Sequence, residues 1–463
     1  MGKLWESPIY KFRISKNSET ATELVEIVFD VTGSAPPFNE PSDELVTVLK
    51  DIFSLADLKP IDTVIEFGAA KLKNIPFILK QGKTVCAVEF EKLTKNPITI
   101  KHLKQCRKYG NKFQNLIFPN PFTQDKNEYD LALLLNVPPV MPVFAERLYL
   151  LELLYGKIKR DKYLLWVAQK EGSYKKDRES GKYFCGDGIW QGKNRHFKTF
   201  YRYHSPEDLD ELMSLYGFKF LKKWNFGSDA RLYEKTEHSL FKGIISEKRI
   251  LDLVPQDKSI SDPEDLKFKE VIKSDKIKII VPNPRELSIE SLYTEKIKAI
   301  PEGPEHAELY QRVVSHALAR IFRGSLRNMD IKQAIKDGIK IVDTLFTNCA
   351  KEGFFHNLKG NVNCTFPIVE VKNYSDDTKN PEVDQLNGRF NDNHGHFGIL
   401  VCRHIKEEDA MYTRCSSVLP NSIILFLTDK DIFELLELSR EQSYDEISDF
   451  MDKKLRALLF KKG

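Results

Sequence analysis

The chain has 463 residues, of which 41% are hydrophobic and 30% are charged, and its formal net charge at pH 7 is +4. This length predicts two or three domains rather than one, and the apolar content is sufficient for a core in each. A net charge this small excludes a global polycation, so any contact with nucleic acid must come from local basic patches.

The cysteines and the N-terminal residues indicate the cell compartment in which the chain is expected. The seven cysteines are scattered and contain no Cys-x-x-Cys pair, which argues against a disulfide scaffold and against a structural zinc site. Residues 1–16 lack the apolar core of a signal peptide, and no stretch approaches the roughly 18 apolar residues of a membrane span. We therefore expect a cytoplasmic protein with no membrane partner.

Strand-like and helix-like segments alternate in the first half of the chain. Short apolar runs predict strands at 63–68, 84–90, 115–122, 129–137 and 162–169. Helices are predicted at 70–83, at 143–159 and from the Ser205–Pro206 start onward. Such alternation is typical of a parallel sheet with helices on its faces. We therefore predict an α/β, Rossmann-like domain over residues 1–235, followed by a connector over residues 236–275.

The second half mixes strands and helices in a less regular order. Strands are predicted at 277–284, 338–346, 366–372, 397–403 and 422–428, and helices at 305–322, 381–393, 430–440 and 447–460. In the first of these helices Leu309, Val313, Ala317 and Ile321 lie four apart, which predicts an apolar stripe. This pattern predicts a second α/β domain over residues 276–463, built on a mixed central sheet.

Charged side chains interrupt two of these apolar strands. Glu370 and Lys372 share one face of the strand 366–372, and Asp343 lies on the strand before it. Charges inside such strands are costly to bury unless they are well paired or perform chemistry. Two converging carboxylates and the carbonyl of Val371 would supply the hard oxygen ligands that Mg²⁺ prefers. Lys372 would stabilise developing charge or position the attacking water; a buried ion-pair network is the alternative.

This Asp…Glu-x-Lys pattern resembles the PD-(D/E)xK, or restriction-endonuclease-like, nuclease superfamily over residues 276–431. The resemblance implies a nuclease that depends on Mg²⁺ or Mn²⁺, with Asp343, Glu370 and Val371 as metal ligands. It also implies that Gln385 supports the site and that an acid of the first helix assists the metal. Glu308 is our candidate for that acid, with Glu305 as its rival. Val342 stands where the superfamily often has proline.

The stretch 64–74 ends a strand with Glu66 and Gly68, in an acid–x–Gly–x–Gly pattern. It resembles the first motif of class I S-adenosylmethionine methyltransferases, and the resemblance covers residues 62–235. The family places a ribose-binding acid at the end of the second strand, where this chain has Glu89. Ala70 replaces the second glycine, and the sequence from Asn136 lacks the Asn/Asp–Pro–Pro–aromatic tetrad of amino-methyltransferases. We expect S-adenosylmethionine to bind weakly or not at all.

Basic and aromatic residues mark candidate surfaces for nucleic acid. The inserted stretch 172–204 interleaves both types, as suits base stacking and phosphate contact, although a locally packed β-ribbon explains it equally well. Its candidates are Trp190, Arg195, Phe197, Lys198, Phe200, Tyr201 and Arg202. Further candidates are Lys332, Lys336 and Lys340, and in the C-terminal tail Lys453, Lys454, Arg456, Lys461 and Lys462.

Together these features predict a metal-dependent nuclease fused to a methyltransferase-like sensing or scaffold domain. DNA is favoured over RNA as the substrate, and the resemblance implies an effector of bacterial defence against foreign DNA. Two alternatives stay open: a bifunctional methyltransferase and nuclease, and a catalytically inactive nucleic-acid-binding assembly protein. Other proteins of a defence complex and further copies of the chain also remain open as partners.

Overall fold

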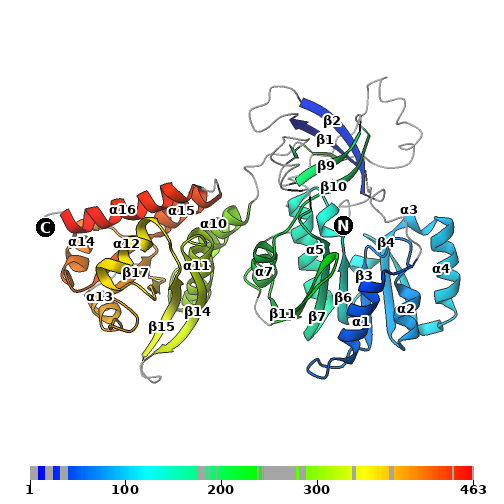
Figure 1. The fold of residues 1–463 in the computed structure, drawn as a ribbon, viewed down its shortest axis with the longest axis horizontal. Coiled ribbons are helices and arrows are strands. Elements are labelled where there is room, and N and C mark those ends of the chain that lie inside the picture. Colours follow the sequence, from blue (N-terminus) through cyan, green and yellow to red (C-terminus); the bar gives the residue numbers. More distant parts are fainter. Residues whose placement is uncertain are drawn as a thin grey trace. The chain divides into compact units, whose positions relative to one another are not determined.

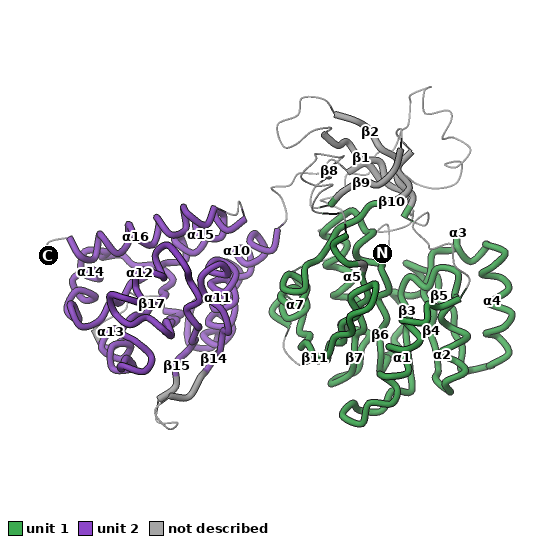
Figure 2. Tube along the Cα trace, viewed as in Figure 1, with its two compact units in different colours: residues 1–284 green, residues 285–463 purple. Residues whose placement is uncertain are grey.

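The structure is a computed structural model whose chain divides into two compact units, residues 1–284 and 285–463 (Figure 2). The described residues are 9–15, 24–31, 40–172, 174, 184–185, 188–193, 196–236, 239–241, 243–244, 278–280, 288–335, 340–374, 380–440 and 443–460.

A seven-stranded sheet forms the centre of the N-terminal unit (Figure 1). Its strands are β3 (Thr63–Phe67), β4 (Thr84–Phe90), β5 (Phe113–Phe118), β6 (Tyr129–Leu135), β7 (Ile158–Gln169), β11 (Phe218–Asn225) and β12 (Ser228–Lys235). The spatial order is β11-β12-β7-β6-β3-β4-β5, and β12 alone runs antiparallel to its neighbours. The predicted parallel sheet is therefore confirmed, with one antiparallel strand near its edge.

Helices connect these strands, as the alternation in the sequence predicts. They are α1 (Asp43–Ser54), α2 (Ile75–Lys80), α3 (Glu91–Thr94), α4 (Pro97–Arg107), α5 (Phe144–Lys157) and α7 (Pro206–Leu215). The predicted Ser–Pro start of α7 is confirmed, because the Ser205 side chain accepts a hydrogen bond of 3.1 Å from the backbone N–H of Asp208. No helix within the described residues of either unit is long and apolar enough to cross a membrane.

Two smaller sheets accompany the large one. One joins β1 (Ile9–Ser15), β2 (Leu24–Asp30) and β13 (Lys278–Ile280), and the other joins β8 (Phe184–Cys185), β9 (Gly188–Lys193) and β10 (His196–Tyr201). Strand β13 pairs in parallel with β1, so the strand that the sequence assigns to the start of the second domain belongs to the first unit. The predicted connector, 236–275, lies largely outside the described residues.

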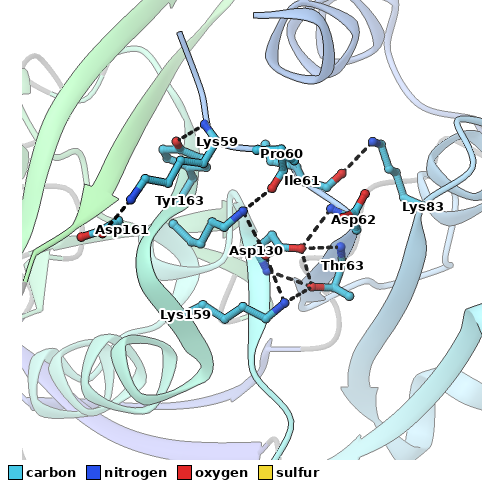
Figure 3. A network of polar contacts seen from close by, with 11 residues as sticks. Lys59, Pro60, Ile61, Asp62, Thr63, Lys83, Asp130, Lys159, Asp161 and Tyr163 are labelled. Carbon is cyan, nitrogen blue, oxygen red and sulfur yellow. Dashed lines mark hydrogen bonds and ion pairs between the residues drawn. The ribbon is translucent and has the colours of Figure 1, made fainter. Parts of the chain in front are cut away.

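A polar network ties β3, β6 and β7 together at the amino end of the sheet (Figure 3). Asp130 accepts hydrogen bonds of 2.9 Å from the backbone N–H groups of Asp62 and Thr63, and Lys159 donates to it at 3.1 Å. Burial acts to raise the pKa of Asp130, but these hydrogen bonds outweigh it and hold the pKa well below its usual range. The network therefore fixes the end of the sheet at which β3, β6 and β7 begin, opposite to their carboxyl ends.

The C-terminal unit is built on a five-stranded mixed sheet. Its strands are β14 (Leu326–Ile335), β15 (Lys340–Asn348), β16 (Ile368–Lys372), β17 (Phe397–Cys402) and β18 (Ile423–Thr428), and they follow one another in this order across the sheet. Antiparallel pairing joins β14, β15 and β16, whereas β16, β17 and β18 run parallel. The predicted mixed central sheet is confirmed.

Helices pack around this second sheet (Figure 1). They are α10 (Ile289–Ala299), α11 (Ala307–Ile321), α12 (Gly353–Val362), α13 (Asn380–Asn387), α14 (Glu408–Ser416), α15 (Asp429–Arg440) and α16 (Tyr444–Phe460). The predicted stripe on α11 is wrong at its first position, because Leu309 is exposed whereas Tyr310 is buried. A strict spacing of four drifts by about 40° per step around a helix of 3.6 residues per turn, so the stripe leaves the buried face.

Candidate functional site

Asp343 and Glu370 lie on neighbouring strands of the C-terminal unit. Thr344 pairs with Val369 across β15 and β16, and the same register places Asp343 opposite Glu370. Side chains opposite each other on antiparallel strands lie about 5 Å apart at Cβ. The Oδ2 atom of Asp343 accepts a hydrogen bond of 2.9 Å from the backbone N–H of Val371, so its carboxylate is held beside Glu370.

The Glu370 carboxylate is 2% exposed and is held by positive charge. Lys372, two residues along the same strand face, donates to Oε1 at 2.8 Å. The same ammonium donates to Oε1 of Gln385 on α13 at 3.4 Å. The structure thus brings together Asp343, Glu370, Lys372 and Gln385, four of the side chains named from the sequence.

Arg389 is a member of this cluster that sequence reasoning missed. It follows α13 and is 7% exposed, and its guanidinium forms an ion pair with Oε2 of Glu370. Burial lowers the pKa of Arg389, and the charge of Asp343 opposes that shift. No local spacing marks it, because α13 ends before Arg389 and its position depends on how the chain returns to the sheet after that helix.

Helix α11 contributes to the cluster through a residue other than the one predicted. Gln311 donates from Nε2 to the backbone carbonyl of Asp343 at 3.0 Å. Glu308, the predicted acid, instead pairs with Lys332 at 2.8 Å, and both side chains are exposed. Lys332 lies on β14 opposite Asp343 in register, with a left-handed backbone at φ 56°. The prediction that Glu308 joins the carboxylates is therefore not met in this structure.

A buried polar network fixes the chain directly after Lys372. Asn373 donates from Nδ2 to the carbonyl of Gly303 at 2.7 Å, and Arg403 donates from Nε to Oδ1 of Asn373 at 2.7 Å. The Arg403 guanidinium also donates to the carbonyl of Ile297 at 2.9 Å. Because strand β16 ends against this network, Lys372 is presented from a rigid support.

The N-terminal unit contains a cavity of about 330 Å³ at the carboxyl end of its large sheet. Residues at the carboxyl ends of β3, β4 and β6 line it, among them Gly68, Glu89 and Asn136. A Cβ atom on Gly68 would lie 2.4 Å from Cγ2 of Val137, so this close approach requires glycine. The carboxyl end of an open α/β sheet is where ligands of such folds bind.

Three buried oxygen atoms in the lining residues of this cavity have no hydrogen-bond partner among the described residues: Glu66 Oε2, Asn74 Oδ1 and Asn136 Oδ1. The Nδ2 atom of Asn74 donates to Oε1 of Glu66 at 2.6 Å. Burial raises the pKa of Glu66 to about 8. Buried polar atoms without partners are costly, so this cavity suits a ligand that supplies hydrogen-bond partners to all three.

Glu89 binds the chain's own backbone. Its Oε2 atom accepts from the backbone N–H of Ala70 at 2.5 Å and its Oε1 from that of Phe90 at 2.7 Å. Ala70 has a left-handed backbone at φ 48°, which costs a residue with a Cβ about 1 kcal/mol or more. Glu89 therefore holds the loop in shape, and one lone pair on each oxygen remains for a further donor.

The inserted stretch differs in part from its predicted role. Phe200 and Tyr201, at the end of β10, are buried and line the cavity, so they are not surface platforms for base stacking. Arg202 donates to the hydroxyl of Tyr174 at 3.2 Å. Arg195 lies outside the described residues, as do Lys336 of the basic patch and Lys461 and Lys462 of the tail.

Solved structures of methyltransferases are similar to the N-terminal part of this chain. The 1,6-didemethyltoxoflavin-N1-methyltransferase of Burkholderia thailandensis is 16% identical over 42% of this chain and 80% of its own, with a TM-score of 0.31. An S-adenosylmethionine-dependent methyltransferase of Methanosarcina mazei is 11% identical over 39% and 95%, with a TM-score of 0.33. The magnesium protoporphyrin IX methyltransferase of Synechocystis is 16% identical over 42% and 81%, with a TM-score of 0.31. No protein-family model matches the chain, and no curated protein sequence does so either.

The N-terminal unit has a Rossmann-like, methyltransferase-like fold. Its own topology establishes this, because β3 lies at the centre, β4 and β5 extend to one side, and β6, β7, β12 and β11 extend to the other. The single antiparallel strand β12, inserted between β7 and β11, distinguishes this arrangement from an all-parallel Rossmann sheet.

Proposed function

We propose that the chain is a metal-dependent nuclease whose active site lies on the C-terminal sheet around Asp343 and Glu370. The observation that carries the proposal is the cross-strand placement of these two carboxylates, with Lys372 bonded to Glu370. The succession α11, β14, β15, α12, β16, α13, β17 supports the predicted restriction-endonuclease-like fold, because it sets both acids on adjacent antiparallel strands. A structural ion-pair network would contribute little stability for the charge that it buries.

The donor set fits a divalent cation. Asp343 and Glu370 supply hard oxygen atoms, and the carbonyl of Val371 lies between Glu370 and Lys372 in the chain. Among the described residues no group of three or more His, Cys, Asp and Glu side chains could hold a metal ion, so the site would rest on two carboxylates and a backbone oxygen. When bound, the cation would polarise the phosphodiester and generate the nucleophile from water.

The chain's own residues then have distinct tasks. The hydrogen bond from the Val371 N–H fixes the Asp343 carboxylate, while Gln311 fixes the backbone of the same strand. Lys372 carries the positive charge that stabilises negative charge as it develops on the phosphate. Gln385 orients this ammonium from α13, which keeps it near Glu370.

The test is cleavage by the purified chain. Linear duplex, circular duplex and single-stranded DNA, together with RNA, are incubated with Mg²⁺, with Mn²⁺ and with a chelator. We expect DNA products that depend on the cation. A chain that cleaves no nucleic acid under any of these conditions would contradict the proposal and favour a binding role.

A prediction for substrate binding concerns Lys332, which is exposed beside Asp343. Lys332→Gln should weaken binding of duplex DNA in Ca²⁺ and lower the slope of log affinity against log salt by about one unit, because one phosphate contact is lost. Fluorescence anisotropy at several salt concentrations measures both. The matched variant Glu308→Gln removes only the partner of Lys332 and should leave the slope unchanged. Equal slopes in all three proteins would mean that this lysine is merely solvated.

We also propose that the N-terminal cavity binds S-adenosylmethionine, as the second function of the chain. The observation that favours it is the set of unpartnered oxygen atoms on Glu66, Asn74 and Asn136 in a cavity of this size. The cofactor offers donors to the two amide oxygens and a positive charge that favours the ionised form of Glu66. This departs from the expectation of weak or absent binding, and titration calorimetry with S-adenosylhomocysteine tests it.

A prediction concerns Ala70, whose Cβ atom affects both the backbone strain of the loop and the space for the cofactor. Ala70→Gly should stabilise the unit by about 1 kcal/mol, because glycine adopts the left-handed backbone without strain. It should also bind S-adenosylhomocysteine more tightly, because the Cβ atom leaves the cavity lining. Thermal unfolding and calorimetry measure the two effects. Ala69→Gly is the matched control, and the buried Ala69 should lose stability on the same change. Unchanged ligand affinity in Ala70→Gly would show that this Cβ is no obstacle.

A further inference from the structure

The charge balance around Glu370 raises a problem for metal binding. Both oxygen atoms of this carboxylate are held by cations, Oε1 by Lys372 and Oε2 by Arg389. With Asp343 included, two negative charges face two positive ones. A divalent cation that approaches Glu370 would therefore meet a neutralised site and two like charges, which repel it strongly in a buried environment.

Of the two cations, Arg389 is the one that can leave without breaking the support of the other. Lys372 is tied to strand β16 and is bonded to Gln385 as well as to Glu370. Arg389 follows the end of α13, in the turn after the helix, and carries a long side chain. The charge of Asp343 also acts on its guanidinium, so Arg389 lies in the field of both carboxylates, as a metal ion would.

Guanidinium groups bind phosphate with the same planar geometry with which they bind carboxylate. We propose that Arg389 is a substrate-binding residue: it pairs with Glu370 until a divalent cation displaces it, and it then binds the phosphodiester of the nucleic acid. This inference rests on the proposed nuclease function. It makes metal binding and substrate binding depend on one side chain in opposite ways.

The experiment measures both affinities in the full chain. Mn²⁺ is titrated by calorimetry, and a short DNA duplex is titrated by anisotropy in Ca²⁺. For Arg389→Met we expect Mn²⁺ to bind about tenfold more tightly, since the competing charge is gone, and DNA to bind about tenfold more weakly, since a charged hydrogen-bond donor is lost. Arg389→Lys keeps the charge but loses the planar guanidinium with its paired N–H donors. Its affinities for Mn²⁺ and for DNA should both fall between those of Arg389→Met and the wild type. Arg107→Met on α4, which removes an exposed guanidinium elsewhere, is the control.

Arg389→Met should raise the affinity for Mn²⁺ and lower the affinity for DNA. A purely structural role for Arg389 would instead weaken both affinities or neither. Weaker Mn²⁺ binding by Arg389→Met, or DNA binding at the wild-type level, would overturn the inference and leave the nuclease proposal intact. If neither wild type nor Arg389→Met binds Mn²⁺, both proposals fail. Tighter Mn²⁺ binding together with weaker DNA binding, in a chain that cleaves nothing, would overturn the nuclease proposal and keep only the competition between Arg389 and the cation. If Arg389→Met does not fold, Arg389→Lys tests the inference, because it should also bind Mn²⁺ more tightly and DNA more weakly than the wild type.

Discussion

Glu370→Gln should lower the rate of metal-dependent cleavage by about 10³-fold, because it removes a charged metal ligand while keeping the size of the side chain. Glu370 is nearly fully buried, lies opposite Asp343 and is bonded to Lys372, so no other described carboxylate can take its position. Single-turnover cleavage at saturating Mg²⁺ measures the loss. Lys372→Met should cause a loss of similar order, whereas Gln385→Ala, which removes only support for the ammonium, should cost less.

The control must account for stability. Glu370→Gln leaves Lys372 and Arg389 beside a neutral amide, and breaking a buried pair in this way costs about 3 kcal/mol. Glu290→Gln is a matched variant, because Glu290 forms a buried ion pair of 2.8 Å with Arg320 in the same unit. We expect Glu290→Gln to lower the unfolding midpoint comparably and to cleave at the wild-type rate. Full activity in both Glu370→Gln and Lys372→Met would end the assignment of a nuclease site here.

Much of the fold follows from local patterns in the sequence. Buried strands such as β17 and β18 are continuous apolar runs, and Glu66 near the end of β3 with Gly68 directly after it marks the end of a strand in a parallel sheet. The edge strand β14 escaped prediction, because its sequence, with Arg327, Asp330 and Lys332, is too polar to read as a strand. Only its pairing with β15 forms the strand, and pairing is not a local property.

The part of the candidate site that depends on the alternation of side chains along a strand was predictable from the sequence. Glu370 and Lys372 share a face because side chains alternate along a strand, and this alternation is a local property of the backbone. The partner of Glu370 on the far side, Arg389, depends on how the end of α13 returns to the sheet. Likewise Gln311 rather than Glu308 contacts Asp343, because the rotation of α11 is set by which residues it buries. Tertiary packing, and not spacing in the sequence, therefore determines the contacts of both Arg389 and Gln311.

The second large effect is expected in the stability of the N-terminal unit against pH. Burial raises the pKa of Glu66 to about 8 in the folded chain, from an ordinary value of 4.5. Below pH 4.5 both the folded and the unfolded chain hold the proton, so the contribution of Glu66 to stability is fully present. Between 4.5 and 8 the unfolded chain releases the proton and the folded chain keeps it. The free energy of unfolding therefore falls with rising pH across this window, by about 5 kcal/mol in all.

Glu66→Gln should remove this dependence, since a glutamine carries no proton to lose while its Oε1 can still accept from Nδ2 of Asn74. Chemical unfolding at intervals from pH 4.5 to 9 measures the change, and the variant should be the more stable protein at the alkaline end. Burial also raises the pKa of Glu89, to about 7, so a weaker decline in the same direction should remain in Glu66→Gln. Glu91→Gln, at an exposed position on α3, should follow the wild-type profile.

The same carboxyl group connects stability to ligand binding. A ligand that brings a positive charge to Glu66 favours its ionised form, so binding near pH 7 should release a proton from the folded chain. Calorimetry in two buffers of different ionisation enthalpy counts that proton, with S-adenosylmethionine as the probe. In Glu66→Gln the release should vanish. Binding without proton release in the wild-type chain would mean that the ligand's charge does not reach Glu66, and the unpartnered oxygen would then need another donor.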